Sequence, residues 1–373
     1  MLKKPYSGME TAFVPRDVSG KTGYTLLDDL EKDAAWRTCE RSGIIQIIEH
    51  FNLAYALQAL SQIGLADVLR ESKTGIDLRE HSGLKQPLLE RFMDYLEIHG
   101  VVQRDQDTPH RVVATAHGLD LLHECSLAQL GFYVEAYGGT LSEIPRLLTG
   151  EAVYGADFVR DGRALGEHCA TLFRHFHTDT ILKILQDRSV SSILDLGCGG
   201  GQFLVDAALK YAHLRGIGLD LSPDAIAFAN ALAEEHGVSD RIKFKVGDAF
   251  RSSEWPEECL ECKVITAVGV LHEHFRSGEK AVIDLLNGLA DHCRDGDRTF
   301  VLGEPEIRMD RQKSDSDLFL VHIFTAQGFP RTREAWLDVI DRSTFECRRV
   351  YTRPNAGPRF NFFQLIPERR KSP

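Results

Sequence analysis

The sequence predicts an α/β protein in which a mainly helical domain precedes a doubly wound, mostly parallel sheet. Two observations predict this class. From residue 193 onward, short apolar runs alternate with helical patterns, as in sheets that carry helices on both faces. Before residue 120, apolar residues recur at the spacing of amphipathic helices. A chain of 373 residues is also long for one hydrophobic core, so we expect two domains.

The first part of the chain is predicted to form an arm and a small helical domain. Residues 1–40 mix charged residues with Gly and Pro, and indicate an arm with little core of its own. Helices are predicted for FNLAYALQALSQIGLADVL at residues 51–69, with a break at Gly64, and for the segment PLLERFMDYLEIHG. Two β-rich runs flank a polar Asp-Thr-Pro turn within residues 101–118 and predict a hairpin. Helices followed by such a wing indicate a winged-helix domain.

The second half of the chain is predicted to hold the sheet. Five strands are expected, at residues 193–197, 216–220, 242–246, 262–268 and 298–303. The segments TFECRRVYTRP and FNFFQLIP supply two more, which makes seven. We therefore expect an arm, a winged helical domain, linker helices that line a cleft, and a sheet domain, at residues 1–40, 41–120, 121–190 and 191–373.

A glycine-rich turn follows the first predicted strand. In the run ILDLGCGGGQFL, Asp195 ends the strand, and Gly197, Gly199 and Gly201 follow at alternate positions. Glycines allow positive φ and let a ligand approach the backbone closely. Asp220 ends the next strand, where an acidic residue holds a ribose diol in doubly wound sheets. The pattern predicts a nucleoside cofactor, although the third glycine comes one residue too early for the G-x-G-x-x-G fingerprint of dinucleotide-binding folds.

The order D-x-G-x-G-x-G, then Asp220, then VGDAF with Asp248 resembles class I S-adenosylmethionine-dependent methyltransferases. The resemblance implies a Rossmann-like sheet of seven strands whose last two are antiparallel. It also implies S-adenosylmethionine as the cofactor, with its methionine, ribose and adenine parts held in turn by three groups of residues, namely Asp195 with Gly197, Gly199 and Gly201, then Asp220 with Leu221, then Asp248 with Ala249.

The helical region before the sheet resembles the dimerisation platform of the small-molecule O-methyltransferase family. Together with the apolar helix at residues 51–69, this resemblance implies a homodimer. A DNA-binding role for the wing is disfavoured, because Glu90, Asp94 and Glu97 outnumber Arg91 on the helix that would meet the phosphates.

Composition narrows the partners further. A net charge of -11 and a pI near 5.8 disfavour binding to nucleic acid. No apolar run reaches the length of a membrane span, so we expect no membrane partner. Eight cysteines scattered over the chain suit reduced thiols, and we expect a cytoplasmic protein.

The fourth predicted strand ends in His272-Glu273-His274, which places side chains where ligands bind in open α/β sheets. The stretch resembles the LHDW-like segment of two-domain O-methyltransferases, whose His is the general base for a phenol. Here Glu273 replaces Asp and His274 replaces Trp. We therefore predict His272 and Glu273 as catalytic residues, since an imidazole suits base chemistry near neutral pH.

Two further histidines suggest a metal. His322 lies in an apolar helix, where an imidazole needs a partner, and His177 follows Phe173 by four residues on a linker helix. We predict that His177, His272 and His322 hold a Zn²⁺ or iron ion, with His175 and His168 as alternatives to His177. This set resembles the metal-dependent 2-oxo acid C-methyltransferases, which act on phenylpyruvate, branched-chain oxo acids or 2-ketoarginine.

For the substrate we expect a 2-oxo acid. The acidic residues Glu273, Glu304 and Glu306 favour a cationic one, 5-guanidino-2-oxopentanoate (2-ketoarginine), and only four methionines are present to line an apolar pocket. Arg174 or Arg331 would hold its carboxylate. The alternative is metal-free O-methylation of a phenol or similar hydroxyl with His272 as the base.

Overall fold

The computed structural model describes residues 30–186, 190–295, 298–307, 316–325, 327–353 and 359–368. Contacts divide the chain into two compact units, residues 1–52 and 53–373, which are described separately. The predicted arm lies mostly outside the described residues. Its described part belongs to helix α1, which has no buried residue.

Two helices account for the described part of the first unit, α1 (Leu30–Ser42) and the first half of α2 (Ile44–Gln62). Helix α2 begins seven residues before the predicted start at residue 51. Its buried residues all lie in its last third, from Ala56 onward. In its first half, Ile44, Ile47, Ile48 and Phe51 are exposed in the single chain.

The second unit begins with a small helical core and a short sheet. The predicted break at Gly64 is confirmed, since this residue has φ of 75° and precedes α3. The predicted hairpin is also present, and a strand that the sequence did not indicate joins it to give the order β1-β3-β2. The elements are α3 (Leu65–Glu71), β1 (Ile76–Asp77), η1 (Leu78–Glu80), α4 (Gln86–Ile98), β2 (Val102–Arg104) and β3 (Arg111–Ala114).

Helices link this core to the large sheet. One of them, η2, is a π-helix, and α9 carries the predicted His168 and His175, with His177 at its C-terminal cap. The elements are α5 (Ala116–Leu121), α6 (Glu124–Gly131), η2 (Phe132–Ala136), α7 (Gly138–Ser142), α8 (Ile144–Thr149), α9 (Gly162–Phe176) and α10 (Thr178–Gln186).

The large sheet has seven strands, as predicted, and their order is β6-β5-β4-β7-β8-β10-β9. The first five are parallel, and β10 runs antiparallel to both β8 and β9. Each strand lies within two residues of its predicted bounds. The strands are β4 (Ser192–Leu196), β5 (Arg215–Asp220), β6 (Ile242–Val246), β7 (Val264–Val268), β8 (Thr299–Pro305), β9 (Phe345–Thr352) and β10 (Phe360–Pro367).

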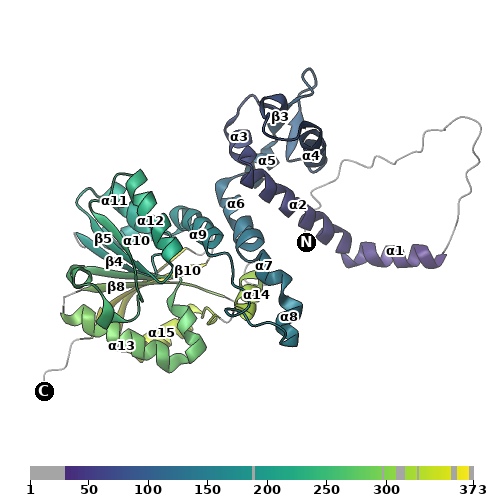
Figure 1. The fold of residues 1–373 in the computed structure, drawn as a ribbon. Coiled ribbons are helices and arrows are strands. Elements are labelled where there is room, and N and C mark those ends of the chain that lie inside the picture. The colour runs from purple at the N-terminus through teal and green to yellow at the C-terminus, as the bar shows by residue number, and fades with distance from the viewer. Residues whose placement is uncertain are drawn as a thin grey trace, which may run out of the picture. The chain divides into compact units, whose positions relative to one another are not determined.

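Helices cover both faces of this sheet, because its strands are apolar on both sides. Figure 1 shows α10, α11 and α12 on one side and α13 and α15 on the other. Along β4, Ile193 packs into the first layer, and Leu194 and Leu196 pack into the second. The remaining elements are α11 (Gln202–Lys210), α12 (Pro223–Glu235), η3 (Ser252–Glu254), η4 (Glu257–Glu261), η5 (Leu271–Ser277), α13 (Glu279–Asp295), α14 (Ser316–Phe324) and α15 (Arg333–Asp341).

Within the part of the chain that the structure describes, no helix combines the length and the apolar character needed to cross a bilayer.

Candidate active site

The glycine turn lies where strand order changes direction. Strand β4 has β5 on one side and β7 on the other, so the loops after β4 and β7 diverge to opposite faces and leave a crevice at the carboxyl edge. Gly197, Gly199 and Gly201 in the loop after β4 have φ values of 70°, 51° and 75°. Residues with a Cβ rarely adopt this conformation, so the turn requires glycine.

Contacts separate the roles of these three glycines. A Cβ on Gly197 would lie 2.7 Å from Val270 Cγ1, and one on Gly201 would lie 2.4 Å from Phe244 Cζ. Protein packing therefore fixes both positions. A Cβ on Gly199 would meet nothing within 4 Å, so the space beside this residue is open to a ligand.

The backbone of the turn is held by Asp220, at the end of β5. Its Oδ2 accepts a hydrogen bond of 3.0 Å from Gly199 N, and its Oδ1 accepts one of 2.9 Å from Ser222 N. The neighbouring Leu221 is 69% exposed, which is unusual for a leucine at the end of a central strand. An apolar ligand surface would cover it.

The third predicted loop follows β6, the next strand of the sheet. Asp248 Oδ1 accepts a hydrogen bond of 2.9 Å from Phe250 N, and the carbonyl of Ala249 accepts one of 3.1 Å from Trp255 Nε1. Because β4, β5 and β6 are parallel neighbours, all three predicted cofactor loops lie along one edge of the sheet.

Asp195 is buried, with 6% of its surface exposed. Its Oδ1 accepts a hydrogen bond of 2.5 Å from Thr266 Oγ1 on the neighbouring strand β7. Burial raises the pKa of Asp195 to about 7, the Thr266 hydroxyl opposes this rise, and the negative charge of Asp220 adds to it. Thr266 was not predicted as a site residue, because a single threonine in an apolar strand is typical of ordinary β structure.

His272, the predicted catalytic histidine, lies shortly after the end of β7, in helix η5. Its Nδ1 lies 2.7 Å from Glu304 Oε2, and Glu304 Oε1 accepts a hydrogen bond of 2.8 Å from Leu271 N. Glu304 ends β8 and is fully buried. The prediction that Glu304 pairs with a substrate cation is therefore wrong, because both of its oxygens are used inside the protein. Glu306 is also buried, next to Asn361 and Arg333 N.

His322 lies on α14 and meets His272 across the site. The two Nε2 atoms are 3.3 Å apart, and His322 Nδ1 lies 2.6 Å from the carbonyl oxygen of Leu318. Burial lowers the pKa of His322 to about 4, so its ring is neutral at pH 7. The structure thus brings together two of the three predicted metal ligands.

The third predicted ligand lies elsewhere. The His177 ring packs on Phe360, with ring centroids 4.2 Å apart, and burial lowers its pKa to about 4. The alternatives are also engaged, since His168 Nε2 lies 3.0 Å from Glu135 and His175 Nε2 lies 2.7 Å from Glu124. Among the described residues, no group of three or more His, Cys, Asp or Glu side chains is placed to hold a metal. The predicted three-histidine set is therefore wrong.

Glu273 follows His272 and is the predicted acid that stays accessible. Its Oε1 accepts a hydrogen bond of 3.1 Å from Gln327 Nε2 and lies 3.7 Å from Arg160 Nη2. Arg160 also donates to the Tyr137 hydroxyl at 3.1 Å. Arg160 was not predicted as a site residue, because it lies in a segment without periodicity.

The two arginines predicted for the substrate carboxylate have other neighbours. Arg174 contacts Gln202 at 3.4 Å, and the Arg331 guanidinium lies 4.7 Å from the centre of the Phe275 ring. His274 packs edge-on against Phe250, the residue after the predicted adenine loop.

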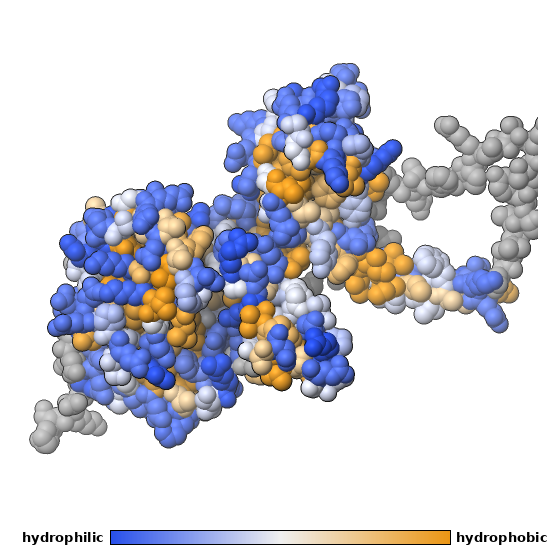
Figure 2. All heavy atoms as spheres, viewed as in Figure 1, coloured by the Kyte–Doolittle hydropathy of each residue, from blue (hydrophilic) through white to orange (hydrophobic). Residues whose placement is uncertain are grey.

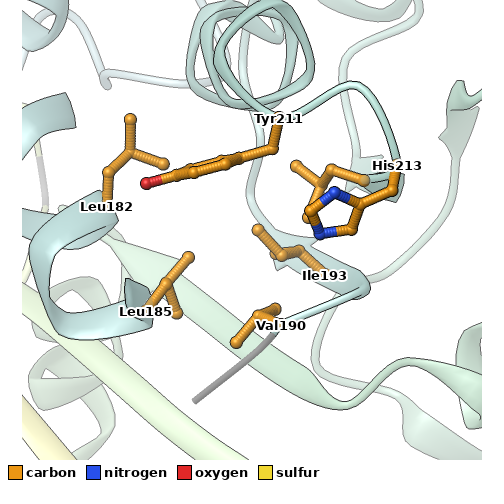
Figure 3. Close-up of a pocket in the computed structure, with 7 residues that line it drawn as sticks. Leu182, Leu185, Val190, Ile193, Tyr211 and His213 are labelled. Atoms are coloured by element: carbon orange, nitrogen blue, oxygen red, sulfur yellow. The ribbon is translucent and has the colours of Figure 1, made fainter. Parts of the chain in front are cut away.

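An apolar pocket of about 120 Å³ lies at the opposite edge of the sheet (Figure 3). Its lining comes from α10, the start of β4 and the segment before β5, with Tyr211 and His213 as the polar members. It contains none of the predicted site residues.

Comparison with known proteins agrees with this geometry. Residues 187–284 match the profile of a methyltransferase domain. The protein is an S-adenosylmethionine-dependent methyltransferase. The methyltransferase is 24% identical over 244 residues to methyltransferase ungE' of Aspergillus campestris, a match that covers 64% of this chain and 69% of the relative.

Solved structures of two proteins share the fold of the methyltransferase over most of its length. The mitomycin 7-O-methyltransferase MmcR has a TM-score of 0.57 at 17% identity, and the match covers 90% of this chain and 99% of that one. LepI, solved in complex with S-adenosylmethionine, has a TM-score of 0.58 at 13% identity, covering 91% and 93%. At such identities the likeness shows the fold, and the substrate must be argued from the side chains.

Proposed function

We propose that the methyltransferase transfers a methyl group to the carbon next to the ketone of a 2-oxo acid, at a metal ion held by His272 and His322. The observation that carries this proposal is the meeting of two imidazole Nε2 atoms, 3.3 Å apart, in a buried site.

The partners of the two rings assign their protons. The Leu318 carbonyl can only accept a hydrogen bond, so Nδ1 of His322 carries the proton and Nε2 of the neutral ring carries a lone pair. His272 Nδ1 can likewise donate to Glu304 Oε2, which leaves its Nε2 available as a ligand. Two imidazole nitrogens this close need a positive centre between or beside them, either a proton on one ring or a bound cation, and the proposal takes the cation.

The pair fits a metal ion in two respects. Two imidazole ligands of one tetrahedral ion stand about 3.3 Å apart, given metal–nitrogen bonds of roughly 2.0 to 2.1 Å. Metal-binding histidines also hold their second nitrogen on a carboxylate or a backbone carbonyl, and here Glu304 and Leu318 do so. His272 and His322 would hold the ion, and oxygens of a 2-oxo acid would supply further ligands, since the described residues offer no third side chain for it.

The chemistry divides between the ion and the side chains. A bound cation supplies Lewis-acid stabilisation of the enolate of the oxo acid. Arg160 offers a guanidinium to the substrate carboxylate, and Glu273 beside it accepts the proton that leaves the carbon. The methyl group passes from the sulfonium to that carbon, and the cofactor leaves as a neutral thioether. Glu304 keeps the His272 ring fixed throughout.

The proposal also concerns which side chain the 2-oxo acid carries. Of the acids predicted to favour a guanidinium, Glu304 and Glu306 are buried and engaged within the protein. Glu273 lies beside Arg160 and is assigned the substrate proton, so none of the three acids is left to pair with a guanidinium. The test therefore places 5-guanidino-2-oxopentanoate beside phenylpyruvate and a branched-chain oxo acid.

One observation favours the second candidate, metal-free O-methylation. A histidine whose Nδ1 is held by a carboxylate is a common general base, and the Glu304–His272 pair has this form. Against it, the basic Nε2 of His272 faces His322 at 3.3 Å instead of open space.

The test is methyl transfer from labelled S-adenosylmethionine to a panel of 2-oxo acids and phenols, with product analysis by mass spectrometry and NMR. We expect a new carbon–methyl bond on a 2-oxo acid, and loss of this activity in His322→Ala. The control His213→Ala removes an exposed histidine at the opposite edge of the sheet and should retain activity. Methylation of phenol oxygens alone, unaffected by His322→Ala, would support the second candidate instead.

A further inference from the structure

The pair of Asp195 and Thr266 lies in the centre of the sheet, beneath the glycine turn. These residues are register partners on the parallel strands β4 and β7. Thr266 is fully buried, and its Oγ1 lies 2.5 Å from Asp195 Oδ1 and 3.4 Å from the carbonyl oxygen of Leu194. Among the described contacts, no donor bonds to Asp195 Oδ2. One carboxylate oxygen is thus fixed, and the other is left for a ligand.

The surroundings of this carboxylate are short of positive charge. Asp220, at the end of β5, is close enough to disfavour ionisation of Asp195, and the Cys198 thiol in the turn faces both acids. No lysine or arginine is among the groups that act on Asp195. A hydroxyl is therefore the principal group of the protein that stabilises the anion at this position.

We propose that Thr266 is a positioning residue for the cofactor, because its hydroxyl holds the Asp195 carboxylate in the orientation and the ionised form that the cationic end of S-adenosylmethionine requires. This inference rests on the assignment of the glycine turn as the cofactor site, and does not depend on the metal or the substrate. The cofactor carries a sulfonium and an ammonium against one carboxylate, so it brings the positive charge that the site lacks.

The hydrogen bond can adapt to either state of the acid. When Asp195 is ionised, Thr266 donates its proton to Oδ1. When Asp195 is protonated, the acid donates to Thr266, which then turns its own proton toward the Leu194 carbonyl. The cofactor favours the ionised state, so its binding releases a proton wherever Asp195 is protonated in the free protein.

The test is calorimetric titration of S-adenosylmethionine between pH 5.5 and 7.5, a range in which the cofactor ammonium stays mostly charged. Burial raises the pKa of Asp195 to about 7, so its ionised fraction falls as pH falls through this range. We expect wild-type affinity to drop at least tenfold from pH 7.5 to pH 5.5. Buffers of different ionisation enthalpy should reveal release of close to one proton at pH 6.

Thr266→Val removes the hydroxyl and keeps the shape of the side chain. We expect affinity at pH 7 to fall at least fivefold and the midpoint of the pH profile to move upward, whereas Thr266→Ser should restore both. Thr180→Val is the matched control, since it removes a buried hydroxyl that has no hydrogen-bond partner in the described structure. If Thr266→Val does not fold, Thr266→Ala also removes the hydroxyl and tests the same role.

The possible outcomes distinguish the role of Thr266 from the assignment of the cofactor site. Wild-type affinity and an unshifted pH profile in a folded Thr266→Val would overturn the role of Thr266. Asp195→Ala tells whether the site itself is correctly placed, because unchanged affinity in this variant would reject the cofactor assignment. Loss of affinity in Asp195→Ala with none in Thr266→Val would reject the role of Thr266 alone.

Discussion

Glu304 is the residue on which the geometry of His272 depends. A fully buried carboxylate is stable only when its oxygens are hydrogen-bonded, and Glu304 meets this need with Leu271 N and His272 Nδ1. The same two bonds fix the start of helix η5 and orient the imidazole. Glu304 thus serves both the fold and the orientation of His272, whereas the sequence analysis expected it to meet a substrate cation.

Gly328 follows α14, the helix that carries His322, and packs against η5, the helix that carries His272. A Cβ on this residue would lie 2.1 Å from the His272 carbonyl oxygen, 2.9 Å from that of Glu273 and 3.0 Å from Arg276 N. The loop after α14 therefore packs directly on the backbone of η5. Gly328→Ala must push the two apart, at a cost of roughly 1 to 3 kcal/mol for an overpacked contact.

We expect Gly328→Ala to lower the free energy of unfolding by this amount and methyl transfer at least tenfold, with affinity for S-adenosylmethionine unchanged. Gly288→Ala is the control, because Gly288 is exposed in α13 with nothing within 4 Å of its Cβ position. It should stabilise the protein by up to about 1 kcal/mol. Urea unfolding measures both, and equal stability of Gly328→Ala and wild type would count against the contact.

Site residues could be predicted where a reactive residue type occupies an informative position in the sequence. His272 at the end of a strand and His322 among apolar neighbours both signalled a partner, and the structure pairs them. His177 shares a helix face with Phe173, as its spacing predicted, yet that face meets aromatic rings. Spacing gives the face of a helix, and only the tertiary structure gives what the face contacts. Thr266 and Arg160 carried no pattern at all.

At the scale of elements, helix α2 has two different halves. The apolar residues predicted to mediate dimerisation, such as Leu57, Leu60, Leu65 and Leu69, lie in the core of the second unit. Ile44, Ile47 and Ile48 are 40%, 61% and 51% exposed and share one face of the first half. Figure 2 shows hydrophobic residues gathered along this part of α2. Apolar residues three and four positions apart form a stripe along one face of a helix. Two copies of such a stripe can pack against each other about a two-fold axis.

We propose that a second copy of the chain covers this stripe. Ile47→Glu places a charge in its centre and should convert a dimer into a monomer at micromolar concentration. Gln46→Glu adds the same charge about 100° around the helix from Ile47 and about 160° from Ile44 and Ile48, and should leave the dimer intact. Sedimentation or light scattering decides, since the mass should be twice the 41.8 kDa of one chain in the wild type. A wild-type mass of 41.8 kDa would contradict the proposal.

The elements of the sheet were predictable because each strand is a short apolar run between clear turns. The antiparallel order of β8, β10 and β9 followed from resemblance alone, as strand direction leaves no mark on composition. Strand β1 has only two residues and η2 departs from α-helical spacing by one residue per turn, so neither produces a periodic signal. Short and irregular elements depend on tertiary contacts.

At the scale of the whole molecule, the sheet brings separate parts of the sequence to one edge. The loops after β4, β5 and β6 form the expected cofactor site, and the segment after β7 carries His272. The segment before α9 and helix α14 then add Arg160 and His322, which are distant in the sequence. The expected cofactor site and the proposed metal site therefore rest on different elements, and each can be removed without the other.

The metal content of the purified protein, measured together with its activity after chelation, decides whether a bound ion takes part in the reaction. We predict about one zinc or iron ion per chain, loss of methyl transfer to a 2-oxo acid when the ion is removed, and recovery when it is restored. His322→Ala should lose the ion and keep its affinity for S-adenosylmethionine. Methyl transfer to the carbon of a 2-oxo acid by fully demetallated protein would contradict the account and leave His272 as a simple base.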